Sequence, residues 1–173
     1  MAGRFRKRRY LARRTTFFGR YQAHKRQRVA YAAPTVTVLY GATGTNKTRQ
    51  VHEYVEKNGG YSNFHIQGPA AGSWFDGYAG QEIVLFDEYR GGLKWSELLY
   101  ITDGYPGIKV QVKGGMVPFS PKHIFITSSI APEEWYRTEH SKDHYAQFAR
   151  RITKVVCTDP AAPSPLFDNA QFE

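Results

Sequence analysis

The chain has 173 residues, 41% of them hydrophobic, which suits one globular domain with a substantial core. No run approaches the roughly 20 apolar residues that a membrane helix needs, so no membrane partner is expected. The single cysteine, Cys157, excludes an internal disulfide and a cysteine-rich zinc site, and it suits a reducing compartment. The net charge is +9, but residues 1–33 carry 11 of the 24 Lys and Arg and no acid, whereas the remainder has 13 basic and 15 acidic residues. A basic arm therefore precedes a near-neutral domain.

The arm, residues 1–33, combines clustered arginines with aromatic residues and lacks a convincing apolar period. Like charges at this density repel one another, so we expect the arm to be disordered in isolation. Arginine binds phosphates and aromatic rings stack on bases, which predicts nucleic-acid binding, and the same cluster suits nuclear import. The alternative is a solvated tail without a defined role. The residues predicted to bind nucleic acid here are Arg4, Arg6, Lys7, Arg8 and Arg9.

The run TVTVLY, residues 35–40, is short, apolar and β-branched, which predicts a buried parallel strand. In the segment TRQVHEYVEKNGG that follows, Val51, Tyr54 and Val55 share one helical face. The pair Asn58-Gly59 then signals the end of that helix.

Between this strand and helix lies GATGTNKT, one residue away from the phosphate-loop pattern G-x-x-x-x-G-K-[ST]. In such loops, backbone N–H groups and the helix N-terminus surround phosphate, so Lys47 is predicted to reach the β- and γ-phosphates of ATP and Thr48 to bind Mg²⁺. Asn46 occupies the second glycine position, and asparagine tolerates left-handed backbone angles better than most residues. The predicted ATP-binding residues are Gly41, Ala42, Thr43, Gly44, Thr45, Asn46, Lys47 and Thr48.

A second buried strand is predicted at residues 83–86 of QEIVLFDEYR, and it delivers Asp87 and Glu88 at its carboxyl end. Ligands bind at that end of the strands in open α/β sheets. Asp87 is predicted to hold Mg²⁺, directly or through water, and Glu88 to polarise the attacking water as general base.

A cluster of aromatic residues precedes this region, and an apolar helical pattern follows it. Trp74, Phe75 and Tyr78 have rings that can stack on bases, but we assign them to the core or to a subunit contact. Trp95, Leu98 and Leu99 are predicted to share the buried face of a helix.

The remaining segments complete the predicted domain. GIKVQVKGGMVPF alternates apolar residues around Gly114-Gly115, which predicts a β-hairpin with Lys109 and Lys113 near its tip. HIFITSS predicts a further strand, and YAQFARRITKVVC a helix that leads into a last strand. Residues 158–173 are Pro-rich and expected to be loose. His140 and His144 lack the further ligands of a zinc site, so surface positions are expected.

In this order and spacing, the motifs resemble the helicase domain of Rep, the replication-associated protein of circular single-stranded DNA viruses, especially circovirus-like ones. The resemblance runs from about Thr35 to about Val156 and rests on the phosphate loop, Asp87-Glu88, VKGGMVPF, IFITS and RRI. It implies a superfamily 3 helicase with an AAA+-like α/β P-loop fold at residues 34–157, a mostly parallel central sheet and flanking helices. Such a helicase would form a homo-oligomeric ring, a hexamer, and use ATP and Mg²⁺ to move along single-stranded nucleic acid in the host nucleus. DNA is the expected strand, with RNA as an alternative.

The resemblance also implies roles for single residues. Lys113, with Gly114 and Gly115, falls on the hairpin that contacts the strand. Ser129 falls where the family has an asparagine that senses the γ-phosphate or orients water. Arg150 and Arg151 form the basic pair of which one member would stabilise transition-state charge in a neighbouring subunit. Asn46 and Ser129 depart from the family pattern without removing a charge, so nucleotide binding is expected to survive, while hydrolysis is left open.

Full-length Rep proteins begin with an endonuclease domain that carries a histidine pair and a tyrosine nucleophile. This sequence has no His-x-His, so nicking activity is not expected, and its arm looks more like the N-terminus of a circovirus capsid protein. Two functions therefore stay open: an ATP-dependent helicase, or a nucleic-acid-binding protein with little or no motor activity. A capsid-like structural role rests on the arm alone, and the phosphate loop argues against a jelly-roll shell.

Overall fold

The computed structural model describes residues 33–136 and 141–158, with the side chains of residues 141–144 excepted. Residues 1–32, 137–140 and 159–173 lie outside the described residues. The predictions for the arginine cluster of the arm, for the Pro-rich tail and for the His140 and His144 side chains therefore stay predictions. Within the described part of the chain, no helix is long and apolar enough to cross a membrane.

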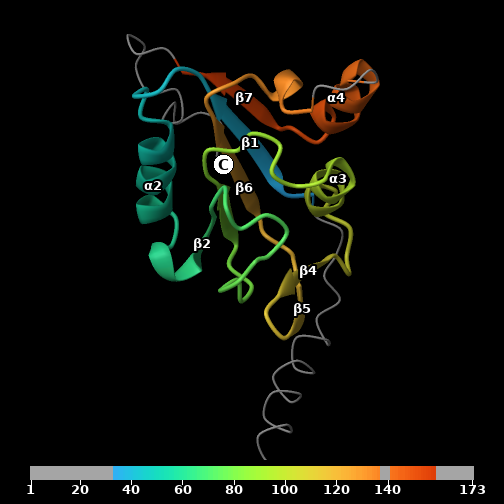
Figure 1. Ribbon diagram of the computed structural model, residues 1–173. Helices are drawn as coiled ribbons and strands as arrows, with labels where there is room; N and C mark the ends of the chain where they lie inside the picture. Colours follow the sequence, from blue (N-terminus) through green and yellow to red (C-terminus); the bar gives the residue numbers. More distant parts are fainter. Residues whose placement is uncertain (1–32, 137–140, 159–173) are drawn as a thin grey trace, which may run out of the picture. The chain divides into compact units, whose positions relative to one another are not determined.

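The described residues form an α/β domain on a five-stranded sheet in which every pair of neighbouring strands is parallel (Figure 1). The strand order is β2-β3-β6-β1-β7, so β6 lies between the strand before the phosphate loop and the strand before the acid pair. The carboxyl ends of these three strands consequently meet at one edge. The predicted α/β class with a central parallel sheet is confirmed. The strands are β1 (Thr35–Tyr40), β2 (Phe64–Gln67), β3 (Ile83–Phe86), β6 (His123–Ser128) and β7 (Lys154–Cys157).

The other elements follow the predicted order. The helix after the phosphate loop, the helix near Trp95, the helix before the last strand and the β-hairpin are all present. Strand β2 is the one member of the main sheet that the sequence pattern does not predict, because FHIQ is a four-residue edge strand without a sustained apolar run. These elements are α2 (Lys47–Lys57), η1 (Tyr61–Asn63), α3 (Trp95–Thr102), β4 (Lys109–Val112), β5 (Gly115–Pro118), η2 (Pro132–Glu134) and α4 (Ser141–Ala149).

Two hydrophobic clusters cover the two faces of the sheet, because successive side chains of a strand point to opposite faces. On one face, Leu39 and Leu85 pack with Val51 and Val55 of α2. On the other face, the clustered strand residues pack with the buried side of α3 and with Phe148 of α4. Figure 1 shows α2 on one side of the sheet and α3 and α4 on the other. The sheet is thus packed between helices on both faces.

The three aromatic residues of the segment before β3 differ in burial. Phe75 and Tyr78 are buried in the cluster that also contains Phe119, which confirms their assignment to the core. Trp74 instead has 51% of its surface exposed and forms an isolated bridge with Gln111 of the hairpin. Its position is therefore at the surface beside β4 and not in the core, so for Trp74 the alternative of a subunit contact stays a prediction.

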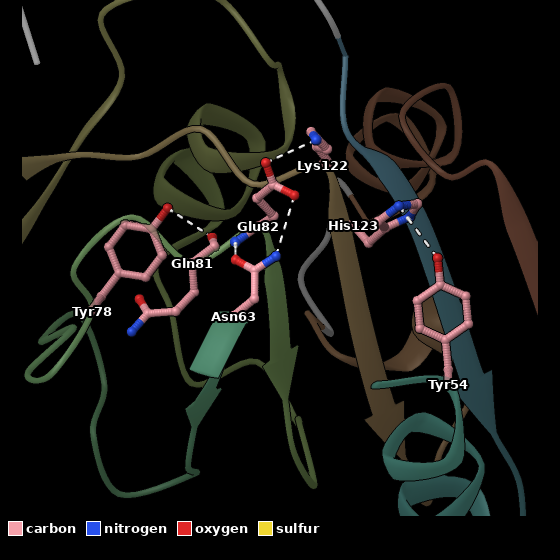
Figure 2. A network of polar contacts seen from close by, with 7 residues as sticks. All are labelled: Tyr54, Asn63, Tyr78, Gln81, Glu82, Lys122 and His123. Carbon is pink, nitrogen blue, oxygen red and sulfur yellow. Dashed lines mark hydrogen bonds and ion pairs between the residues drawn. The ribbon is translucent and has the colours of Figure 1, made fainter. Parts of the chain in front are cut away.

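At the amino edge of the sheet, a polar network ties β3 and β6 to the turn before β2 (Figure 2). The Glu82 carboxylate accepts from Lys122 Nζ at 2.8 Å and from Asn63 Nδ2 at 3.2 Å. The Glu82 N–H donates to Asn63 Oδ1 at 2.8 Å, and its carbonyl accepts the N–H groups of Lys122 and His123. Hydrogen bonds from Lys122 and Asn63 hold the pKa of Glu82 below its usual range. The network thus links the starts of β2, β3 and β6, at the edge of the sheet opposite to the phosphate loop.

Two histidines near this part of the fold have lowered pKa values. Burial lowers the pKa of His65, against a smaller opposing effect of the hydrogen bond to Gln67. Burial also lowers the pKa of His123, and the neighbouring Lys122 lowers it further. Figure 2 shows the His123 ring directed at the Tyr54 hydroxyl, 3.3 Å from Nε2, while the buried Nδ1 has no hydrogen-bond partner among the described residues. A proton on either ring therefore favours the unfolded chain.

We expect the free energy of unfolding to fall as the pH is lowered from about 7 to about 5. Histidine in the unfolded chain has a pKa of about 6.5, above the folded values of His65 and His123, so the unfolded chain takes up protons first. The measurement is the thermal midpoint across a pH series for the parental protein, for His123→Gln, and for His52→Gln on the surface of α2 as control. The slope should shrink in His123→Gln and persist in His52→Gln. An undiminished slope in His123→Gln would contradict this account.

Candidate nucleotide site

The phosphate loop lies between β1 and α2, as the sequence predicts, and α2 begins at Lys47. Asn46 has φ 58° and ψ 23°, in the left-handed region that the second glycine of the motif would supply. Gly41 and Gly44 also have positive φ, at 143° and 87°. Asparagine is one of the few residues with a side chain that adopts such angles at low cost. The substitution at position 46 therefore preserves the turn into the helix.

Lys47 reaches back into the loop and has only 5% of its surface exposed. Its Nζ donates to the carbonyl oxygens of Gly41 at 2.9 Å and Ala42 at 2.7 Å, and to Thr45 Oγ1 at 3.3 Å. A full positive charge is thus held inside the loop, at the positive end of the α2 dipole. Phosphate oxygens are the acceptors that this ammonium and the N–H groups of the helix N-terminus can serve together.

Thr158, the residue after β7, contacts the phosphate loop and the end of β1. Its Oγ1 lies 2.6 Å from Thr45 Oγ1, and its N–H donates to the Tyr40 carbonyl at 2.8 Å. A Cβ added to Gly41 would lie 2.5 Å from the Thr158 carbonyl oxygen, so only glycine permits this approach. The sequence carries no signal for Thr158, because its contact with Thr45 spans 113 residues.

The two halves of the site meet through Thr48 and Asp87. The Thr48 hydroxyl donates to Asp87 Oδ1 at 2.8 Å, across 39 residues of sequence. The structure therefore brings together the two residues predicted to bind Mg²⁺. One carboxylate and one hydroxyl suit Mg²⁺, which prefers oxygen ligands and retains waters beside substrate phosphates. The described residues contain no group of three or more His, Cys, Asp and Glu that could hold a metal ion by themselves.

Glu88 follows Asp87 in an unusual backbone conformation. Its φ is 51°, and Asn46 is the only other non-glycine residue with positive φ in the described part of the chain. Both lie at the candidate site, where backbone strain commonly accompanies function. The Glu88 N–H donates to Thr127 Oγ1 at 3.0 Å, and the residue is exposed. The role of Glu88 as general base stays a prediction.

The end of β6 lies beside the phosphate loop. The Ser128 carbonyl accepts the Gly41 N–H at 3.2 Å, and Ser128 Oγ accepts from Trp135 Nε1 at 3.0 Å. Ser129 comes next and is half-buried. The predicted water-orienting residue therefore follows the strand between the two halves of the site, and its role stays a prediction.

Arg150 and Arg151 do not lie at this site. Both precede β7, whose first residue Lys154 pairs with Thr37, so they lie near the amino edge of the sheet. Arg151 forms an ion pair with Asp103, with Nε at 2.8 Å and Nη2 at 2.7 Å from Oδ1. Arg150 is exposed. Both arginines thus lie away from the phosphate loop of the same chain.

The hairpin is also separate from the nucleotide loop. Gly114 has φ 93° at its turn, and the neighbouring Lys113 has 88% of its side chain exposed. Lys113 donates to Asp76 through its backbone N–H at 2.7 Å and its Nζ at 3.3 Å. The backbone bond from Lys113 is the main cause that lowers the pKa of the Asp76 carboxyl. The hairpin is thus held by the segment that precedes β3, with its turn in solvent.

No protein-family model matches this chain. The curated relatives include replication-associated proteins of circoviruses and of a cyclovirus. The protein of Goose circovirus is 35% identical over 156 residues, which cover 87% of this chain and 50% of that protein. The protein of Porcine circovirus 1 is 40% identical over 120 residues, covering 69% and 36%, and that of Human associated cyclovirus 1 is 36% identical over 122 residues, covering 70% and 42%.

Among solved structures, the S. cerevisiae Hsp104–ADP complex is similar at a TM-score of 0.47 and 15% identity, covering 73% of this chain and 24% of that chain. A complex of S. cerevisiae Hsp104 with casein is similar at a TM-score of 0.46 and 17% identity, covering 73% and 29%. The strand order and the loop between β1 and α2 define the α/β fold of this chain. The chain spans half or less of the length of the curated relatives given above. Over most of its length, this chain is 34–40% identical to these and other replication-associated proteins of circoviruses and cycloviruses.

Proposed function

We propose that the described domain is an ATP-dependent helicase or NTPase of the viral Rep type, of superfamily 3, acting in replication of a circular single-stranded DNA genome. The observation that carries the proposal is the hydrogen bond between Thr48 and Asp87, beside a buried Lys47. This contact joins the phosphate-binding and acid halves of the site in a chain that is related to replication-associated proteins.

In this proposal, ATP binds with its β- and γ-phosphates on the loop of residues 41–48. Lys47 exchanges its carbonyl partners for phosphate oxygens, while the N–H groups at the start of α2 bind the remaining oxygens. Thr48 and Asp87 would hold Mg²⁺, which would supply positive charge to the phosphates. Residues Lys47 and Thr48 lie next to each other at the start of the helix, so one turn of backbone positions both.

Glu88 is the proposed general base. Its carboxylate takes a proton from the attacking water as the water oxygen forms a bond to the γ-phosphorus, while the bond to the bridging oxygen breaks and its electron pair leaves with ADP. Lys47 stabilises the charge that develops on the phosphate oxygens. Ser129, the residue after β6, is proposed to orient the water through a hydroxyl that is shorter than the asparagine side chain of the family.

The proposed partners are single-stranded nucleic acid, DNA ahead of RNA, and further copies of this chain in a ring, a hexamer. The separation of the two arginines from their own site agrees with a role across a subunit boundary. Arg151 is engaged by Asp103 within the subunit, so we assign the transition-state contact in a neighbouring subunit to Arg150. We place this activity in the host nucleus, on the basis of the arginine cluster in the arm.

The experiment that tests the proposal is steady-state ATP hydrolysis by the purified protein, with and without Mg²⁺ and with and without single-stranded DNA. Mg²⁺-dependent turnover that rises with DNA supports a motor domain. ATP binding without turnover would contradict the proposal and favour the second candidate, a nucleic-acid-binding protein with little or no motor activity. The serine at position 129 is the observation that favours that second candidate.

Deletion of residues 1–33 is expected to weaken nucleic-acid binding and to flatten its dependence on salt. The arm carries 11 Lys and Arg, and each phosphate contact adds about 0.7 to the slope of log K against log salt on single strands. The measurement is a salt titration of binding to a fluorescent single-stranded oligonucleotide by the full chain and by residues 34–173. Equal slopes for the two proteins would show that the arm does not contact the strand.

A further inference from the structure

Thr127 occupies a central place between the two acids of the proposed site. It lies on β6, opposite Leu39 of β1, and is fully buried. Its Oγ1 donates to Asp87 Oδ1 at 2.8 Å and accepts the Glu88 N–H at 3.0 Å. Its backbone carbonyl accepts the N–H of Tyr89 at 2.7 Å. One threonine thus contacts three consecutive residues after β3.

The single hydroxyl proton of Thr127 fixes the direction of this array. Because the Glu88 N–H can only donate, the hydroxyl oxygen accepts there, and its proton is directed at the Asp87 carboxylate. Hydrogen bonds in such a chain strengthen one another, and a bond to an ionised acceptor is stronger than a neutral one. The carboxylate of Asp87 and the backbone of Glu88 are therefore held relative to each other through one oxygen atom.

Asp87 Oδ1 accepts two hydroxyl groups, those of Thr48 and Thr127. Thr48 is itself a proposed metal ligand, so its hydroxyl is the one whose partner changes when the site is loaded. Thr127 is buried and has no such second task. Its hydroxyl therefore orients the Asp87 carboxylate both in the empty site and in the site loaded with nucleotide and metal.

The second contact of Thr127 concerns the direction of the Glu88 side chain. A non-glycine residue at φ 51° is uncommon and is maintained only where its surroundings hold it. Here Thr127 accepts the N–H groups of Glu88 and Tyr89, which lie before and after the Cα atom of the strained Glu88. Loss of the hydroxyl frees the first of these groups, and the backbone can then relax to an ordinary conformation that turns the carboxylate away.

We propose that Thr127 is a positioning residue of the hydrolytic site, which sets the orientation of the Asp87 carboxylate and of Glu88 without touching the nucleotide. The inference rests on the proposed function, since it concerns the residues assigned there to metal binding and to proton transfer. It adds a residue on the strand between the two motifs, which sequence patterns place only in the core.

The test compares Thr127→Val, which keeps the branched shape and removes the hydroxyl, with Thr127→Ser, which keeps the hydroxyl. Thr37→Val is the matched control, because Thr37 is a buried threonine in the neighbouring strand β1 that pairs with Phe125 and Lys154, away from the carboxyl edge. For each variant, kcat and KM for ATP, the Mg²⁺ concentration at half-maximal rate, and the thermal midpoint are measured.

We expect Thr127→Val to lower kcat by about 10- to 100-fold and to raise the half-maximal Mg²⁺ concentration, with KM for ATP changed less than about threefold. Thr127→Ser should restore most of kcat, and Thr37→Val should leave both quantities near the parental values. Equal loss of kcat in the Val and Ser variants would overturn the positioning role, as would a Val variant with parental kcat and Mg²⁺ dependence. A parental protein without Mg²⁺-dependent turnover would overturn the proposed function, and this inference with it.

Discussion

Lys47→Ala is expected to abolish Mg²⁺-dependent ATP turnover, to below about one-hundredth of the parental rate. The substitution removes the positive charge that the loop holds against its own carbonyls and that the proposal assigns to the phosphates. The carbonyls of Gly41 and Ala42 lie in a partly exposed loop, where water can replace the ammonium. The destabilisation should therefore be modest, about 1 kcal/mol, and the fold should persist.

The measurement for Lys47→Ala is steady-state turnover together with the thermal midpoint and the circular dichroism of the purified variant. Lys57→Ala is the control, because Lys57 is an exposed residue at the end of the same helix. Lys57→Ala should hydrolyse ATP at the parental rate. If Lys47→Ala did so as well, the assignment of the phosphate loop would be wrong.

Glu88→Gln is expected to lower turnover by about 10²- to 10⁴-fold while nucleotide binding is retained. The amide has the shape of the carboxylate but cannot take a proton from water. The backbone conformation of residue 88 is held through its N–H group by Thr127, so the substitution leaves the local geometry intact. The effect should therefore appear in kcat, with little change in the dissociation constant for ATP in the presence of Mg²⁺.

Binding of a fluorescent ATP analogue and single-turnover hydrolysis separate these two quantities. Glu53→Gln is the control, because Glu53 pairs with Arg49 on the surface of α2 and lies outside the site. Parental turnover in Glu88→Gln would contradict the assignment of the general base. Loss of ATP binding in that variant would instead indicate that Glu88 supports the loop, and not the attacking water.

The sequence by itself determines the parts of the site that are encoded in short segments. The strand before the phosphate loop, the loop, and the helix that begins at Lys47 are contiguous, and their apolar periods and glycines specify them locally. The run before Asp87 likewise predicts a buried strand with acids at its carboxyl end. Asn46 is a further case, since its tolerance of left-handed angles is an intrinsic property of the residue, and the structure confirms φ 58° there.

Only the tertiary structure decides which of these segments meet. The hydrogen bonds of Asp87 to Thr48 and Thr127 span 39 and 40 residues, and the contact of Thr158 with Thr45 spans 113. They depend on the strand order, which places β6 between β1 and β3, and on the register of parallel strands whose ends share one edge. Pairing of strands is a long-range choice, so no local pattern marks Thr127 or Thr158 as part of the site.

The same distinction explains the two arginines. The dipeptide at 150–151 contains no feature that separates its members, because both side chains are the same and both follow one helix. The tertiary structure decides the matter, since it brings Asp103, the residue after α3, within 2.7 Å of Arg151 and leaves Arg150 exposed. Local sequence therefore determines which functional side chains this protein contains. Tertiary packing determines which of those side chains contact one another.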